Sequence, residues 1–74
     1  MQIFIKNISG KTITIGDISP TTTIDELKAE IHHSEGNPIE DQRLIYQGKQ
    51  LSNGHLEDYG IGDNATLHLV LRMR

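Results

Sequence analysis

The sequence contains no cysteine, so neither a disulfide bond nor a thiol nucleophile is available to it. It also lacks tryptophan and has a single phenylalanine. The core must therefore be aliphatic, and the chain supplies eleven Ile, seven Leu and one Val for it. At 74 residues the chain lies near the lower size limit for one hydrophobic core. We expect a single, closely packed domain over residues 1–74.

Long apolar runs and one-sided charge are missing as well. No segment approaches the roughly 20 apolar residues of a membrane span, and Gln2 and Lys6 interrupt any signal-peptide pattern. The net charge is −3 with both signs spread along the chain, which argues against nucleic-acid binding. Phosphate and metal motifs are absent, and His32 and His33 would point about 100° apart on a helix. We expect no enzyme activity, no metal or cofactor, and no nucleic-acid or membrane partner.

Alternating apolar residues predict two strands at the N-terminus, over residues 1–7 and 11–18. Gly10 can supply the positive φ of a short turn between them, so the two strands should pair antiparallel. Gly16-Asp17 breaks the alternation and marks either a bulge or the end of the second strand.

Residues 19–36 change to helical spacing, with Ile24, Leu27 and Ile31 on one face. Thr23 followed by Glu26 fits a capping box, in which each residue bonds the other's backbone amide. Gly36 suits the left-handed stop that often ends a helix.

The second half predicts three more strands. Residues 42–51 form a strand, a turn at Gln47-Gly48 and a short strand, and residues 66–72 form the last strand. The polar segment between them should be a loop with one helical turn at Leu56–Tyr59. The order β-β-α-β-β-β predicts an α+β fold, with one amphipathic helix on a mixed sheet of four to five strands. The opposite face of the sheet must then meet water.

From end to end the sequence resembles the ubiquitin family, through the stretches MQIF, GKTITI, QRLIY, GKQL and TLHLVLR. Two length changes interrupt the match, an extra residue around Gly16-Asp17 and a missing one between Gly54 and Leu56. The resemblance implies the β-grasp fold, in agreement with the predicted order. It also implies a monomeric protein modifier, joined to other proteins by an isopeptide bond, in the ubiquitin-proteasome system of the cytoplasm and nucleus.

Alternation places Ile45 and Val70 on the solvent face of the sheet, while Ile8 lies at the tip of the first hairpin. Single exposed apolar residues need no explanation, whereas a cluster usually marks a contact site. By the resemblance, these three residues and His68 match the family's main recognition surface. Burying three such side chains gains roughly 5–9 kcal/mol, and association costs about 4–15 kcal/mol. The patch alone should therefore bind weakly.

Other side chains could enlarge this surface. Arg43, Lys49 and Arg72 are candidates for a binding rim, or they are ordinary solvated charges. A secondary patch is predicted on the same sheet, made of Gln2, Phe4 and Thr12.

The C-terminal stretch LRMR is expected to lie beyond the pairing partners of the last strand, either as a frayed end or as a handle. The resemblance implies that an activating enzyme recognises Leu71, Arg72 and Arg74, and that conjugation uses a terminal Gly-Gly. Glycine suits that role because a tight catalytic channel leaves no room for a Cβ. Conjugation by this route would require Gly-Gly beyond Arg74.

Ubiquitin lysines accept further ubiquitins, and several of them have counterparts here. The candidate acceptors are Lys6, Lys11, Lys28 and Lys49. The family's lysines are replaced at Glu30, Ser34 and Asp63.

Two functions are open from the sequence. The first is a modifier recognised by ubiquitin-binding domains, activating and conjugating enzymes and proteasome receptors. The alternative is a non-conjugated docking domain of a larger adaptor or scaffold protein. The residues that follow Arg74 in the gene would separate the two.

Overall fold

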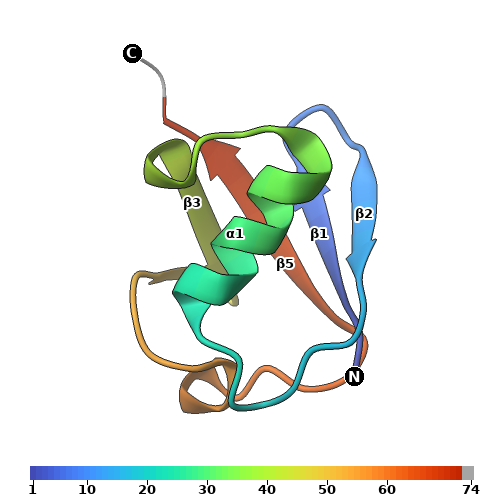
Figure 1. Ribbon diagram of the computed structural model, residues 1–74, viewed down its shortest axis with the longest axis vertical. Coiled ribbons are helices and arrows are strands. Elements are labelled where there is room, and N and C mark those ends of the chain that lie inside the picture. Colours follow the sequence, from blue (N-terminus) through green and yellow to red (C-terminus); the bar gives the residue numbers. More distant parts are fainter. Residues whose placement is uncertain (73–74) are drawn as a thin grey trace.

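The computed structural model describes residues 1–72 of the chain. Its elements, in order, are β1 (Ile3–Asn7), β2 (Thr12–Ile15), α1 (Ile24–Glu35), the 3-10 helix η1 (Ile39–Asp41), β3 (Gln42–Tyr46), β4 (Lys49–Leu51), the 3-10 helix η2 (Leu56–Tyr59) and β5 (Ala65–Leu71). The five strands form one sheet in the order β2-β1-β5-β3-β4. β1 and β5 run parallel, and the other neighbours are antiparallel. The predicted β-grasp fold is confirmed, with α1 lying across one face of the sheet (Figure 1).

The two hairpins follow from their turn residues. In the first, Gly10 has a φ of 89°, and the Asn7 amide donates to the Lys11 carbonyl at 3.0 Å. In the second, Gln47 and Gly48 both have positive φ, at 51° and 80°, as a tight two-residue hairpin turn requires. β2 ends at Ile15, so the Gly16-Asp17 irregularity is the end of a strand.

Both ends of α1 agree with the prediction. The Glu26 amide donates to Thr23 Oγ1 at 3.0 Å, and the Thr23 amide donates to Glu26 Oε1 at 3.1 Å. At the other end Gly36 adopts the left-handed conformation, and its amide donates to the His32 carbonyl at 2.7 Å. Because the caps satisfy backbone groups that a helix end leaves unpaired, they fix where α1 begins and ends.

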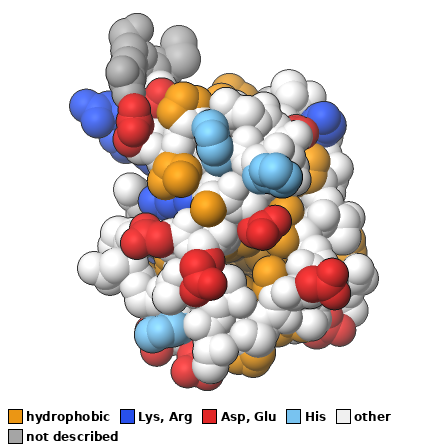
Figure 2. Space-filling model, viewed as in Figure 1, with side chains coloured by type: hydrophobic (Ala, Val, Ile, Leu, Met, Phe, Trp, Pro, Cys, Tyr) orange, Lys and Arg blue, Asp and Glu red, His pale blue; other side chains and the backbone are white. Residues whose placement is uncertain are grey.

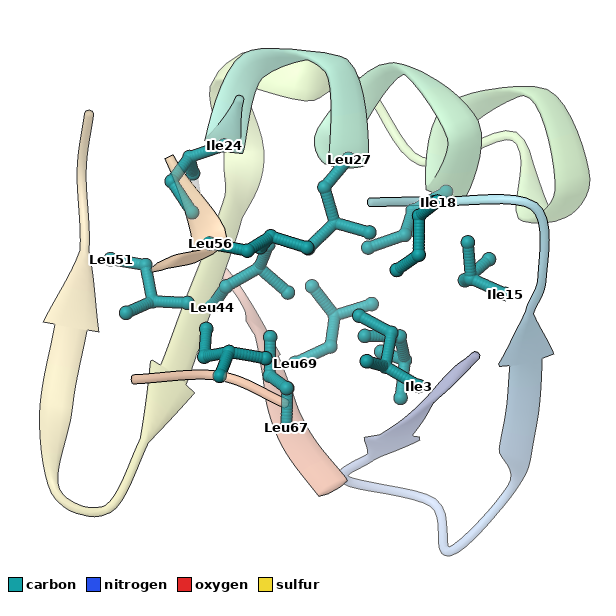
Figure 3. Close-up of a cluster of buried hydrophobic side chains, with 13 residues drawn as sticks. Ile3, Ile15, Ile18, Ile24, Leu27, Leu44, Leu51, Leu56, Leu67 and Leu69 are labelled. Atoms are coloured by element: carbon teal, nitrogen blue, oxygen red, sulfur yellow. The ribbon is translucent and has the colours of Figure 1, made fainter. Parts of the chain in front are cut away.

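The core lies between α1 and the sheet. Ile24 and Leu27 point from α1 toward the strands, where they meet aliphatic side chains of the sheet's inner face (Figure 3). The fully buried residues are Ile3, Ile5, Ile24, Leu27, Ile31, Leu44, Leu51, Leu56 and Leu67. The core is therefore aliphatic, as the composition predicts.

One buried polar residue, Gln42, was not anticipated. Its Nε2 donates to the Lys28 carbonyl at 3.1 Å and to the Asn37 carbonyl at 3.0 Å. Its Oε1 is buried and has no hydrogen-bond partner among the described residues. Gln42 thus joins the start of β3 to α1 and to the segment after it.

The loop before β5 contains the predicted helical turn, η2. The Tyr59 hydroxyl donates to the Asn53 carbonyl at 2.7 Å, and Asp58 Oδ2 accepts from the His55 amide at 2.8 Å. The loop is also tied to the start of α1, since the Ile24 amide donates to the Gly54 carbonyl at 3.0 Å. These bonds hold a glycine-rich segment against the domain.

Candidate functional site: the open face of the sheet

The pairing of β3 with β5 determines which side chains meet on the sheet face that α1 leaves open. Ile45 lies directly opposite His68, and Arg43 lies directly opposite Val70. Ile45 and Val70 are therefore diagonal neighbours on this face, within reach of each other. Both are half-buried, whereas Leu44 and Leu69, which point the other way, are buried in the core.

Ile8 extends this group at one end. Its side chain is 77% exposed, the largest exposure among the bulky apolar side chains of residues 1–72. The parallel pairing of β1 with β5 sets Asn7 beside Leu69, and Ile8 is the next residue, in the turn after β1. The structure thus brings Ile45, His68 and Val70 together, as the alternation predicted, with Ile8 exposed in the turn after β1. These four residues are hereafter the sheet patch. Their role in binding stays a prediction.

The three proposed rim residues lie at different positions. Arg43 is exposed on the patch face. Lys49 is exposed at the hairpin end, where it pairs with Tyr46, and Gln50 is the residue opposite Ile45. Arg72 is exposed just past β5.

The prediction for the C-terminal stretch needs a correction. Leu71 was expected beyond the strand's pairing partners, but it is the last residue of β5 and pairs with Gln42. The Arg72 amide also donates to the Asp41 carbonyl at 2.7 Å. The last strand was predicted to reach Arg72, but without partners at its end; Gln42 and the preceding Asp41 supply those partners. Arg74 lies outside the described residues.

Charge is segregated around the patch. Within residues 1–72 no Asp or Glu lies in a strand; the acidic side chains belong to α1, η1, η2 and the loops. Figure 2 shows carboxylates spread over the side of the molecule that α1 covers. On the sheet, Lys6 lies beside His68 on the neighbouring strand. The open face is therefore apolar and cationic.

The secondary patch is only partly assembled. Phe4 is half-buried on the open face, between Thr14 and Thr66 of the neighbouring strands. Thr12 is exposed two positions away on β2. Gln2 precedes β1, and its amide and side chain bond Asp63 and Asn64 at 2.8 and 3.0 Å.

The candidate acceptor lysines differ in their surroundings. Lys6 and Lys49 are exposed in strands. Lys11 is exposed but forms an ion pair with Glu35 at 3.1 Å, and Lys28 is half-buried on α1. Their use as acceptors stays a prediction.

Sequence reasoning missed one exposed apolar residue, Ile39, which is 40% exposed in η1. It stands alone between Pro38 and Glu40, so no periodic pattern marks it.

No group of three or more His, Asp or Glu side chains within residues 1–72 is arranged to hold a metal ion. His32 Nδ1 instead lies 2.8 Å from the Asn37 carbonyl oxygen. Among the described helices, none is both long enough and apolar enough to cross a membrane.

The model of the ubiquitin family matches residues 3–74. The ubiquitin-like protein NEDD8 of Dictyostelium discoideum is 41% identical over the whole of this chain and 96% of its own length. Ubiquitin-like protein 1 of Schizosaccharomyces pombe is 39% identical over the whole chain and 95% of its own length. The human E3 ubiquitin-protein ligase UHRF2 is 43% identical over 97% of this chain, which is 9% of that protein. This chain belongs to the ubiquitin family.

Proposed function

We propose that this protein is a ubiquitin-like modifier whose sheet patch is recognised non-covalently by ubiquitin-binding domains. The observation that carries the proposal is the register of β3 and β5, which sets Ile45, His68 and Val70 together on the face that α1 leaves open. An aliphatic cluster in that position costs solubility and gives the core nothing, so a contact role explains it best.

The surroundings of the patch suggest the chemistry of its partners. Arg43 and Lys6 lie on the same face, which has no acidic side chain in its strands among residues 1–72. A partner with a central apolar anchor and acidic flanks would complement it, and opposite charges would speed the encounter. The patch is small, so a single contact should be weak, and linked modules would raise the affinity.

Conjugation is part of the same proposal and depends on the tail. An activating enzyme would grip Leu71, Arg72 and Arg74, and an isopeptide bond would form through a terminal Gly-Gly following Arg74. In this role the chain is a substrate of enzymes and not an enzyme itself. Further modifiers would be attached at Lys6, Lys11, Lys28 and Lys49. Proteasome receptors would bind the modified proteins. The protein would act in the cytoplasm and nucleus.

A docking domain within a larger adaptor is the second candidate. The human UHRF2 match favours it, because there a segment like this chain makes up 9% of a much longer protein. Such a domain would use the same sheet patch without ever being conjugated. Mass analysis of the protein from its own cells separates the two: a chain ending in Gly-Gly supports the modifier, and a long continuation supports the docking domain.

The patch is tested by replacing Ile45 with alanine and titrating a ubiquitin-binding domain. Truncating a central apolar contact should weaken binding by about 2 kcal/mol or more, roughly 30-fold. Ile39→Ala is the matched control, since it truncates an exposed isoleucine in η1 and should leave the affinity unchanged. Undiminished binding by Ile45→Ala would remove the patch from the proposal.

A further inference from the structure

The loop after β4 contains Asn53-Gly54, a pair of residues with its own chemistry. The backbone nitrogen of the residue after an asparagine can attack the side-chain amide carbon, and glycine hinders this attack least because it has no Cβ. Asn53 is exposed, and within residues 1–72 its side-chain amide makes no hydrogen bond. The Gly54 amide nitrogen likewise donates no hydrogen bond in the described structure. The attacking and the attacked groups are both free.

The other three asparagines are each protected in a different way. Asn7 Oδ1 accepts three hydrogen bonds, from the Ser9 amide, the Ser9 hydroxyl and the Lys11 amide. Asn64 Oδ1 accepts from Gln2 Nε2, and alanine follows it. Asn37 precedes Pro38, which has no N–H to give up.

The structure also disfavours any residue other than glycine at position 54. Gly54 has a φ of +92°, and a Cβ built there would lie 2.9 Å from Asp58 Oδ2, an atom already held by the His55 amide. A side chain at position 54 would therefore strain the backbone and crowd the first turn of η2. The backbone at position 54 therefore favours glycine, the residue that hinders the attack least.

One hydrogen bond restrains the reaction. The Asn53 carbonyl and the Gly54 N–H belong to the same planar peptide group. Because the Tyr59 hydroxyl donates to the Asn53 carbonyl at 2.7 Å, it also holds the orientation of the Gly54 nitrogen. Ring closure needs that plane to turn toward the Asn53 side chain, so the Tyr59 hydroxyl opposes it.

We propose that Asn53 is a site of spontaneous deamidation in this protein and that the Tyr59 hydroxyl sets its rate. The Gly54 nitrogen loses its proton to solvent base and bonds to Asn53 Cγ. The bond from Cγ to Nδ2 breaks, Nδ2 takes up a proton and leaves as ammonia, and a five-membered succinimide remains. Water then adds to either ring carbonyl, giving aspartate or isoaspartate at position 53. The net change is the exchange of an amide for a carboxylic acid, and neither oxidant nor reductant is needed.

The product differs from the parent in charge and in backbone length. A new carboxylate joins Glu57 and Asp58 beside η2, and the net charge becomes one unit more negative. Isoaspartate also inserts the Cβ methylene of residue 53 into the backbone ahead of Gly54, and it turns the Asn53 carbonyl that accepts from Tyr59 into a side-chain carboxylate. We expect the isoaspartate form to lose the Tyr59 bond.

The experiment follows the folded chain over time in mildly alkaline buffer, with peptide mapping that separates asparagine, aspartate and isoaspartate. Asn53 should deamidate more than an order of magnitude faster than Asn7 or Asn64, and Asn37 should not react measurably. Asn53→Gln should abolish the fast phase, because the longer side chain closes its ring poorly. Equal rates at Asn53, Asn7 and Asn64 would overturn the proposed site.

The restraint is tested with Tyr59→Phe, which should speed deamidation of Asn53 severalfold. Tyr46→Phe removes the same group from the other tyrosine, in β3, and should leave the rate unchanged. Leu67→Ala lowers the stability of the whole domain at a position outside the Asn53 loop. It therefore measures how much global unfolding contributes to the deamidation rate at Asn53. An unchanged rate in Tyr59→Phe, or the same acceleration in Leu67→Ala at matched stability, would overturn the role of Tyr59.

Discussion

Leu67 and Thr66 are neighbours in β5 with opposite environments, since Leu67 is fully buried and Thr66 is exposed. Leu67→Ala should lower the free energy of unfolding by about 2–5 kcal/mol, because it removes core contacts and leaves a cavity. Thr66→Ala, one position away, should change it by no more than about 0.5 kcal/mol. Denaturant midpoints of the two variants measure the difference, and similar midpoints would mean that the strand register is wrong.

Gln42 is a second residue whose contribution can be isolated. Gln42→Ala removes the donor that serves both the Lys28 and the Asn37 carbonyls, so two part-buried hydrogen bonds are lost. The expected loss is about 1–3 kcal/mol of unfolding free energy. Gln50→Ala is the matched control, because Gln50 is exposed in β4 and should be nearly neutral. A small effect at Gln42 in urea denaturation would show that water replaces its hydrogen bonds.

Individual residues differ in how well their environment can be predicted from the sequence. Ile45 and Val70 were placed on the open face because strand alternation has a period of two, a strong constraint. The same alternation places Gln42 on the inner face of the sheet. A polar residue type at an inward position does not, however, predict which carbonyls its side chain will bond. Ile39 was missed because a lone apolar residue in a 3-10 helix belongs to no repeating pattern.

At the scale of elements, the ends of α1 were predictable because their causes are local. The residues that cap α1 lie at its ends or within its first turn, and they are Thr23, Glu26 and Gly36. The end of β5 depends instead on β3, some 30 residues earlier in the chain. That dependence explains why Leu71 and Arg72 were placed beyond the strand's partners when they are in fact bonded to Gln42 and Asp41.

The α1 cap should make stability depend on pH. The Thr23 amide and hydroxyl donate to the Glu26 carboxylate, and these bonds lower the pKa of Glu26 in the folded state. A lowered pKa stabilises the fold above the unfolded-state pKa, about 4.3 for glutamate, and that contribution is lost as the pH falls through the lower folded value. Glu26→Gln should therefore be less stable than the parent at neutral pH, with the difference shrinking below about pH 4.

Urea denaturation at a series of pH values measures this effect. Glu30→Gln makes the same charge change on α1 away from the cap. It should show no comparable convergence with the parent at low pH. If Glu26→Gln and Glu30→Gln respond to acid in the same way, the cap does not produce the dependence.

At the scale of the whole molecule, the sheet has one face committed to the core and one face left without a covering layer. Thirteen buried aliphatic side chains form the core on the face that α1 covers, so the side chains of the open face are not needed to fill it. The strands hold no acidic residue within residues 1–72, although the net charge of the chain is −3. Net charge alone therefore says little about how this surface meets a partner.

This asymmetry predicts how binding to an acidic partner depends on salt. Arg43→Gln removes a cation opposite Val70, so it should slow association with a ubiquitin-binding domain and flatten the dependence of the rate on ionic strength. Ala29→Glu makes the net charge more negative by the same one unit, but at an exposed position of α1. It should slow association far less. Stopped-flow association at several salt concentrations distinguishes them. Equal slowing by both variants would mean that partners respond to total charge, and the open face would lose its role in steering them.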